Sequence, residues 1–238
     1  MHPFLGEFIG TAILIILGEG VVANVVLSKT KGNSTGLIVI AFGWAMAVFT
    51  GIFVAAHFSK AHLNPAFTLA AAYVGNGFSW ADVPAYIGGQ FLGAMTGAVI
   101  VWLAYKLHFV ATPDADAKLA VFCTSPSIRS TPNNLITEMI ATFILVLAAL
   151  YIAAPASTLG ALDALPVALV VLGVGLSLGG PTGYAINPAR DLGPRIMHAI
   201  LPIPGKRDSD WGYAWIPVLG PVVGALLAGV AFKFLGSV

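Results

Sequence analysis

The chain has 238 residues, of which 58% are hydrophobic and 9% are charged, with a mean hydropathy of +0.91. Soluble proteins carry about 25% charged residues, so this composition excludes an ordinary soluble fold and predicts a membrane protein. A formal net charge of +1 without a long basic run gives no electrostatic footprint for nucleic acid. The single cysteine, Cys123, cannot form a disulfide within the chain.

Six apolar runs are long enough to cross a hydrocarbon core about 30 Å thick, which requires roughly 20 residues per helix. They are residues 4–27, 36–56, 84–107, 134–154, 164–178 and 212–235. The first run exceeds the apolar core of a secretory signal, so we interpret it as a permanent span. The sequence therefore predicts an all-α, multi-pass protein of the cell membrane, with one domain over residues 1–238.

Two further apolar segments, residues 64–74 and 187–200, are too short to cross, and each opens with Asn-Pro-Ala. Proline suits the first position of a helix because its missing N–H would be unpaired there, so Pro65 and Pro188 each predict the start of a half-length helix. Non-helical backbone at membrane depth is tolerated only where protein buries it or where it lines a watery cavity. We therefore expect the two segments to re-enter the membrane and to line a pore.

The second half of the chain repeats residues of the first half at a constant offset. The matched pairs include Glu7 with Glu138, Gly89 with Gly220 and Gly93 with Gly224. Because each half holds three spans, the second copy must enter the membrane from the opposite side. The sequence thus predicts inverted repeats over about residues 4–107 and 134–235, an arrangement in which broken helices meet near the midplane. The four glycines are expected to allow close helix packing.

Two segments resemble the signature loops of the aquaporin superfamily, and the resemblance covers the whole chain. They are Ala61-His62-Leu63-Asn64-Pro65-Ala66 and Gly183-Tyr184-Ala185-Ile186-Asn187-Pro188-Ala189-Arg190-Asp191. One Asn-Pro-Ala would be weak evidence, whereas two at the heads of half-helices, the second followed by arginine, are very specific. Asp191 directly after Arg190 is similar to the glycerol-facilitator, or aquaglyceroporin, branch.

The resemblance implies a channel, not an enzyme, for passive diffusion of glycerol, water and other small uncharged solutes, with ions and protons excluded. It implies a homotetramer in the lipid bilayer with one pore per subunit, and we expect neither cofactor nor metal. The expected selectivity filter comprises Trp44, Gly175, Tyr184 and Arg190. The expected central motifs are Asn64, Pro65, Ala66, Asn187, Pro188 and Ala189.

A filter for polyols needs one apolar wall and one hydrogen-bonding wall. Trp44 and the ring of Tyr184 are expected to form the apolar wall, with Arg190 as the donor and Gly175 leaving room for a carbon-bearing solute. Backbone carbonyls of Ala61, His62, Gly183, Tyr184 and Ala185 are expected to form a ladder of acceptors. At the centre, amides of Asn64 and Asn187 donate to the passing oxygen, while the positive ends of the half-helices disfavour cations.

Glu7, Glu138 and Asp191 are interpreted as supports for the loops, the two glutamates because each can accept several backbone N–H bonds. The alternative for Glu7, Glu19 or Glu138 is proton coupling in a secondary transporter. An intramembrane hydrolase is a distant third hypothesis. For Glu19 and His57 we favour an interhelical or interfacial hydrogen bond over a functional role.

Lys60 and Tyr184 depart from the family pattern, which has glycine and commonly phenylalanine at these positions. Lys60 either draws anionic weak acids such as lactate to one mouth or extends its amine to water, and we favour the second. The Tyr184 hydroxyl either narrows the filter or adds a polar contact. A channel preferring undissociated lactic acid or dihydroxyacetone therefore stays open as an alternative.

Charge distribution conflicts with the orientation that the family implies, in which both termini are cytoplasmic. In that orientation most lysines and arginines of the loops fall outside, although cytoplasmic loops usually carry the excess. We follow the resemblance, because the signature loops fix which mouth carries Arg190.

Overall fold

The computed structural model describes residues 3–75, 77–152 and 160–236, and all regular structure within those ranges is helical. Six helices in these ranges are long and apolar enough to cross a membrane. They are α1 (Pro3–Val26), α2 (Leu37–Ala55), α4 (Val83–Ala104, preceded by η1, Trp80–Asp82), α7 (Thr131–Ile152), α8 (Ala164–Thr182, preceded by η2, Gly160–Asp163) and α10 (Ile216–Leu235). The predicted all-helical membrane architecture is confirmed.

Several predicted boundaries shift for local reasons. The third span ends at Ala104 because the chain turns at Tyr105 into the short helix α5 (Lys106–Ala111), which is followed by α6 (Ala115–Phe122). The fifth continues to Thr182, where Gly183 at φ 79° donates its N–H to Gly179 and closes the helix. The sixth begins at Ile216, after a turn over residues 211–215. Ala154, the predicted end of the fourth span, lies outside the described residues.

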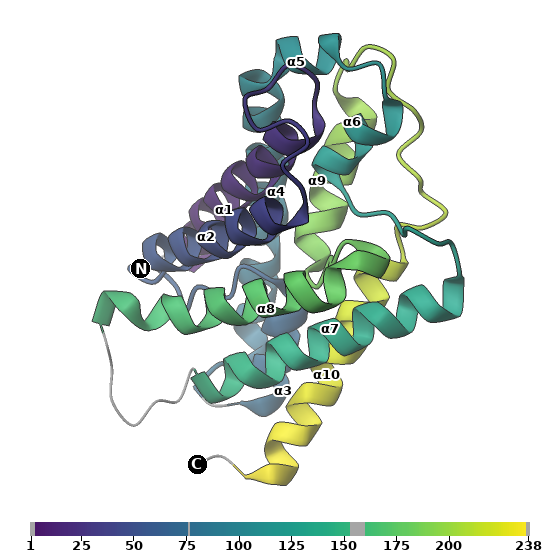
Figure 1. Cartoon of the computed structure of the whole chain (residues 1–238). Helices are drawn as coiled ribbons and strands as arrows, with labels where there is room; N and C mark the ends of the chain where they lie inside the picture. Colours follow the sequence, from purple (N-terminus) through teal and green to yellow (C-terminus); the bar gives the residue numbers. More distant parts are fainter. Residues whose placement is uncertain (1–2, 76, 153–159, 237–238) are drawn as a thin grey trace.

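Two half-length helices, α3 (Pro65–Val74) and α9 (Pro188–Ile200), lie between the spans (Figure 1). Each is capped by the asparagine of its Asn-Pro-Ala: the Asn64 side chain accepts from Ala66 N, and the Asn187 side chain accepts from Ala189 N and Arg190 N. Such caps satisfy N–H groups that have no partner inside the helix, and proline at the first position fits there. The helix starts predicted at Pro65 and Pro188 are therefore confirmed.

Each half-helix packs on a span from the other half of the chain, α3 on α10 and α9 on α4. The most extensive helix–helix contacts join α1 to α4 and α7 to α10. Glycine permits both contacts: a Cβ added at Gly93 would lie 2.3 Å from the carbonyl oxygen of Phe8, and one at Gly224 would lie 2.3 Å from that of Met139. The predicted close packing at these glycines is confirmed.

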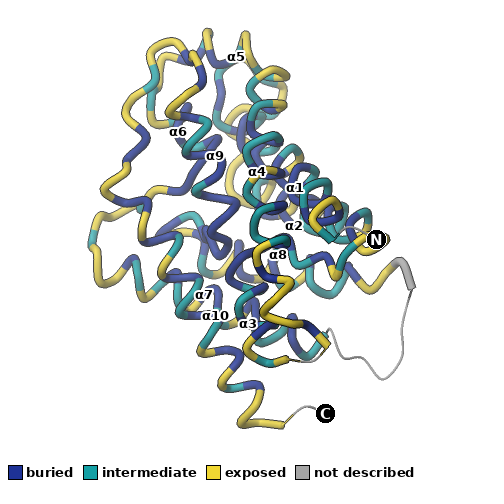
Figure 2. Tube along the Cα trace, turned by 180° about the vertical axis from the view of Figure 1, so that it is seen from behind, coloured by how far each residue is buried: buried dark blue, intermediate teal, exposed yellow. Residues whose placement is uncertain are grey.

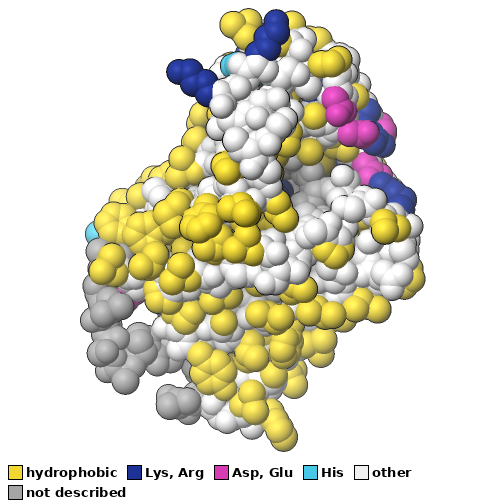
Figure 3. Space-filling view, viewed as in Figure 1, with side chains coloured by type: hydrophobic (Ala, Val, Ile, Leu, Met, Phe, Trp, Pro, Cys, Tyr) yellow, Lys and Arg dark blue, Asp and Glu magenta, His cyan; other side chains and the backbone are white. Residues whose placement is uncertain are grey.

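The apolar exterior is that of a membrane protein. Buried residues run through the centre of the molecule along α9 and its neighbouring loops (Figure 2). Apolar side chains cover the flank formed by the spans, whereas charged ones gather at the end that carries α5 and α6 (Figure 3). Large apolar side chains are exposed on the spans, as at Ile38, Leu103 and Phe234.

Candidate functional site: a pore between two half-helices

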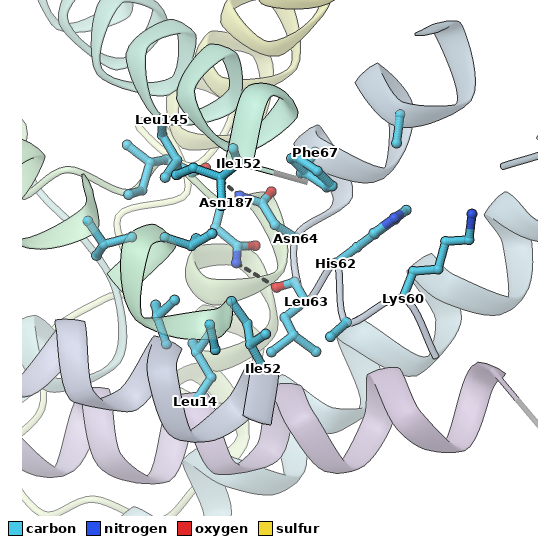
Figure 4. A pocket seen from close by; sticks show the side chains of 18 of the residues that line it. Leu14, Ile52, Lys60, His62, Leu63, Asn64, Phe67, Leu145, Ile152 and Asn187 are labelled. Atoms are coloured by element: carbon cyan, nitrogen blue, oxygen red, sulfur yellow. Dashed lines mark hydrogen bonds between the residues drawn. The ribbon is translucent and has the colours of Figure 1, made fainter. Parts of the chain in front are cut away.

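The loops before α3 and α9 exchange hydrogen bonds at the centre of the molecule. Asn64 Nδ2 donates to the carbonyl oxygen of Ile186 at 2.8 Å, and Asn187 Nδ2 donates to that of Leu63 at 2.8 Å. Figure 4 shows the two asparagines side by side with these bonds drawn. Because an amide nitrogen carries more than one N–H, each asparagine keeps a donor in addition to its bond across the junction.

Both loops share an unusual backbone. The residues three and one before each asparagine have positive φ: Ala61 at 51° and Leu63 at 50° in the first loop, and Tyr184 at 38° and Ile186 at 45° in the second. A left-handed conformation costs a non-glycine residue roughly 1–2 kcal/mol, so it persists only where the surroundings hold it. Backbone strain at equivalent positions of the two loops marks both loops as functional segments.

A buried carboxylate holds each loop. Glu7 accepts from the backbone N–H of His62 at 3.0 Å and of Leu63 at 2.7 Å, and Glu138 accepts from those of Ala185 and Ile186 at 3.0 Å each. Each glutamate also accepts from a hydroxyl, that of Ser59 or that of Thr182. Both glutamates are fully buried in membrane-spanning helices, where such bonds offset the cost of a polar group.

Sequence reasoning missed one further support, Gln90 of α4. Its Nε2 donates to Glu7 at 2.8 Å and to the Thr68 hydroxyl at 2.9 Å, which links the first loop to its half-helix. A lone amide between two glycines of an apolar span was the available signal. The sequence does not show which face of α4 packs against α1, so it could not identify the partners of this amide.

With their N–H groups directed to the glutamates, the loops leave carbonyls free. No described residue donates a hydrogen bond to the carbonyl oxygens of Ala61, His62, Tyr184 or Ala185. All four residues line a cavity of about 830 Å³ that also touches Asn64, Asn187 and Arg190. The cavity lining includes the exposed residues Lys60 and His57 and the buried residues Trp44 and Arg190. Gly183, the remaining residue of the predicted ladder, is not part of its lining.

Trp44 and Arg190, two residues of the expected selectivity filter, contact each other in the cavity wall. The guanidinium carbon lies 4.2 Å from the centre of the indole ring, a cation–π contact that holds the guanidinium over the aromatic ring. Trp44 in turn rests on α1, because a Cβ added at Gly18 would lie 2.3 Å from its ring. Both side chains line the cavity, so an apolar surface and a hydrogen-bond donor adjoin one another there.

The space at Gly175 is taken by Tyr184. A Cβ added at Gly175 would lie 3.1 Å from Tyr184 Cζ, and one at Gly179 would lie 2.6 Å from Cδ1. The two glycines form a flat seat on α8 for the ring, and Gly175 is not among the residues that line the cavity. The Tyr184 hydroxyl is buried and has no hydrogen-bond partner among the described residues. It faces α8 and is not presented to the pore.

Asp191 joins α9 to the segment after α6. Its carboxylate accepts from the N–H and hydroxyl of Thr124, both at 2.7 Å, and from Nε of Arg195 at 2.8 Å. Arg195 is fully buried and donates to the carbonyls of Thr124 and Ser209. This network, of which sequence reasoning identified only Asp191, fixes the segment after α6 against α9.

The ionisable residues left open by the sequence fall in different places. Lys60 lines the cavity mouth and is exposed, and its Nζ donates to the carbonyl of Gly77. His57 is exposed beside it, with its ring edge-on to Phe53. Glu19 is fully buried without a hydrogen-bond partner in the described part of the chain, so the hydrogen bond predicted for it is wrong there. Within the described ranges, no three His, Cys, Asp or Glu side chains gather as a metal site would require.

Six spans, two half-helices joined tip to tip and a lined cavity between them define a multi-pass membrane channel. The chain belongs to the Major intrinsic protein family, whose model matches residues 1–232. The family is one of transport channels, and the six spans place the chain in the cell membrane.

Similar proteins agree over the full length. The chain is 53% identical to a probable glycerol uptake facilitator protein of Thermotoga maritima, over 99% of this chain and 100% of that protein. It is 54% identical to a glycerol uptake facilitator protein of Streptococcus pneumoniae, over 98% and 99% respectively. The X-ray structure of the aquaglyceroporin from Plasmodium falciparum matches with a TM-score of 0.85 and 34% identity, covering 96% of this chain and 93% of that one.

Proposed function

We propose that this protein is a passive channel for glycerol, water and other small uncharged solutes. The observation that carries the proposal is the 4.2 Å stack of Arg190 on Trp44 beside the cavity, which joins a donor to an apolar surface. Relatives above 50% identity that are described as glycerol uptake facilitators support the choice of solute. The work is transport without a chemical step.

At the filter, the CH groups of a polyol slide on Trp44 and the ring of Tyr184, while its hydroxyls accept from Arg190. A planar guanidinium presents several N–H donors in a fixed fork, which suits adjacent hydroxyls. The free carbonyls of Ala61, His62, Tyr184 and Ala185 then act as acceptors for the hydroxyl hydrogens. A permeant exchanges its water partners for these groups, so the free-energy cost of entering the pore is small.

At the midpoint, the remaining N–H groups of Asn64 and Asn187 donate to the passing oxygen. The N-terminal ends of α3 and α9 meet there, and each carries a positive partial charge of about half an elementary charge. A cation is repelled by these ends and by Arg190, and it loses hydration that the narrow passage does not replace. A neutral solute pays neither cost.

The proposal includes inverted repeats over about residues 4–107 and 134–235, with Glu7 and Glu138, and Asn64 and Asn187, in equivalent roles. It also includes a homotetramer with one pore in each subunit. In α2 and α8 only 28% and 33% of the most apolar stretch is buried, against 56% in α1, which leaves these faces for lipid or for neighbouring subunits. Size-exclusion chromatography with light scattering should report four copies, and a monomer in mild detergent would contradict the tetramer.

Stopped-flow light scattering of proteoliposomes tests the solute. We expect rapid, non-saturable glycerol flux in both directions that a pH gradient does not alter. Arg190→Ala should change the ratio of glycerol to water permeability, whereas Arg129→Ala, at an exposed arginine paired with Asp210, should not. Saturable uptake driven by a pH gradient would instead indicate a proton-coupled carrier.

A second candidate is a channel that prefers undissociated lactic acid or dihydroxyacetone. The observation that favours it is the placement of Lys60 and His57 at the cavity mouth, where a cationic group attracts a carboxylate before its protonation. The same liposomes separate the two, because the favoured solute is the one with the higher permeability at equal gradients.

A further inference from the structure

Glu19 is a polar group that the proposed pathway leaves unused. It belongs to α1, its side chain is fully buried, and both carboxyl oxygens lack a hydrogen-bond partner among the described residues. A buried carboxyl without a partner costs several kcal/mol, so one that persists calls for an explanation. Glu7 and Glu138, by contrast, accept hydrogen bonds from the loops on both carboxylate oxygens.

Arg190 holds the complementary unpaired group. Its Nη1 is buried and has no hydrogen-bond partner in the described ranges, although its guanidinium stacks on Trp44. A guanidinium only donates hydrogen bonds and a carboxylate only accepts them, so the two unpaired groups match in kind. The atoms concerned are inaccessible to solvent.

The two groups also lie near the same aromatic side chain. Gly18, the residue before Glu19, lies against the Trp44 ring, and the Arg190 guanidinium stacks on the same ring. Glu19 and Arg190 form no ion pair within 4.0 Å, so they do not bond directly. A buried water molecule can join two polar groups that are too far apart for a direct hydrogen bond.

We propose that Glu19 is a positioning residue for the filter arginine, which it holds through a buried water bound between its carboxylate and Arg190 Nη1. The bridge holds the guanidinium on the Trp44 ring, beside the passage. The carboxylate also balances part of the guanidinium charge, so that the filter repels cations without attracting anions. This role rests on the proposed function, because it assigns Glu19 to the polyol filter.

Glu19→Gln keeps the shape and removes the charge. We expect the ratio of glycerol to water permeability to fall about three- to tenfold, the range that corresponds to the loss of one net hydrogen bond. We expect nitrate leak to rise, measured in liposomes with a potassium gradient and valinomycin. Glu19→Asp, which retains the carboxylate, should restore part of the ratio and suppress the leak. Thr11→Val, at another buried α1 residue whose hydroxyl has no partner, is the matched control and should behave as the parent.

A double-mutant cycle separates positioning from structural damage. In an Arg190→Ala background, Glu19→Gln should change neither the ratio nor the leak, because its partner is gone. An equal loss in both backgrounds, or no change in the parent background, overturns the proposal. A parent that passes water but not glycerol would refute the proposed solute alone, since water flux and nitrate leak still test Glu19.

If Glu19→Gln does not assemble, a crystal structure of the parent at a resolution that shows waters decides the matter. The expected result is an ordered water within hydrogen-bonding distance of both Glu19 and Arg190 Nη1. A dry contact, or an Arg190 Nη1 bonded elsewhere, overturns the proposal.

Discussion

Asn64 and Asn187 are bonded reciprocally: each donates its side-chain amide to the carbonyl of the residue that precedes the other. Each also caps the half-helix that follows it. The junction of the two loops therefore depends on two side chains that do the same work, one from each half of the chain. Because the same atoms face the cavity, the stability of the junction and the passage of solute are linked.

Asn64→Ala and Asn187→Ala should destabilise the protein by similar amounts, about 1–3 kcal/mol each, since each removes a cap and a buried hydrogen bond. Thermal unfolding in detergent measures the loss, and stopped-flow glycerol flux should fall in both variants. Asn133→Ala is the control, because the side chain of this exposed asparagine bonds only to the Ser130 hydroxyl among the described residues. A large difference between the two central variants would contradict the equivalence of the two loops.

Glu138→Gln should impair the second loop without abolishing assembly. The amide nitrogen replaces an oxygen that accepts from Ala185, Ile186 or Thr182, so at least one buried donor loses its partner, at a cost of about 1–3 kcal/mol. We expect lower thermal stability and lower glycerol flux, with the flux still independent of a pH gradient.

The comparison that matters is with Glu7→Gln, which should behave in the same way. If either glutamate carried a coupled proton, its glutamine variant would lose a pH-driven component that the parent shows. A parental flux that follows the pH gradient would therefore refute the supporting role.

The main features of the fold followed from the sequence because they depend on local chemistry. Asn-Pro-Ala fixes a helix start wherever it occurs, since the cap and the proline act on the next few residues. The span count followed from apolar length alone. The equivalence of Glu7 and Glu138 was visible as a repeat, and their bonds to successive backbone amides have the same pattern in both loops.

Contacts that depend on helix rotation did not follow. A span that is apolar on all sides carries no strong periodic signal to show which face meets which neighbour. Gly175 was thus assigned to make room for solute, whereas its space is filled by the Tyr184 ring. Gln90 escaped notice because its partners, Glu7 and Thr68, are distant in sequence. Arg195 lies four residues after Asp191, but its backbone partners at Thr124 and Ser209 are distant. For Glu19 the sequence predicted a hydrogen bond where the described residues offer none.

The seat of Tyr184 on α8 can be tested with three alanines on one helix. Gly179→Ala should be the most harmful, because its Cβ would lie 2.6 Å from the ring, and Gly175→Ala should be milder, at 3.1 Å. Both should push the ring towards the passage and lower glycerol flux more than water flux. Gly173→Ala, whose Cβ meets nothing within 4 Å, should leave both fluxes unchanged. Equal effects of all three would show that the ring does not rest on this seat.

Tyr184→Phe should leave glycerol flux unchanged and raise thermal stability slightly, by up to about 1 kcal/mol. The hydroxyl is buried without a partner among the described residues, so its removal abolishes a desolvation cost and no pore contact. Light scattering with glycerol and thermal unfolding provide the two readings. Lower glycerol flux at equal protein content would mean that the hydroxyl contributes to the filter after all.

Lys60→Met tests whether the charge at the mouth selects weak acids. The Lys60 amine donates to the carbonyl of Gly77, and the residue is exposed, so the charge lies where solvent screens it and the bond ties the loop to the turn after α3. We therefore expect glycerol and lactic acid permeabilities to change by the same factor, less than about twofold, at pH values on both sides of the lactic acid pKa. Lys106→Met, at a lysine stacked on Trp102 in another part of the molecule, controls for the loss of a surface charge. A selective fall in lactic acid flux, largest where the anion predominates, would instead assign the mouth lysine to the capture of carboxylates and favour the second candidate solute.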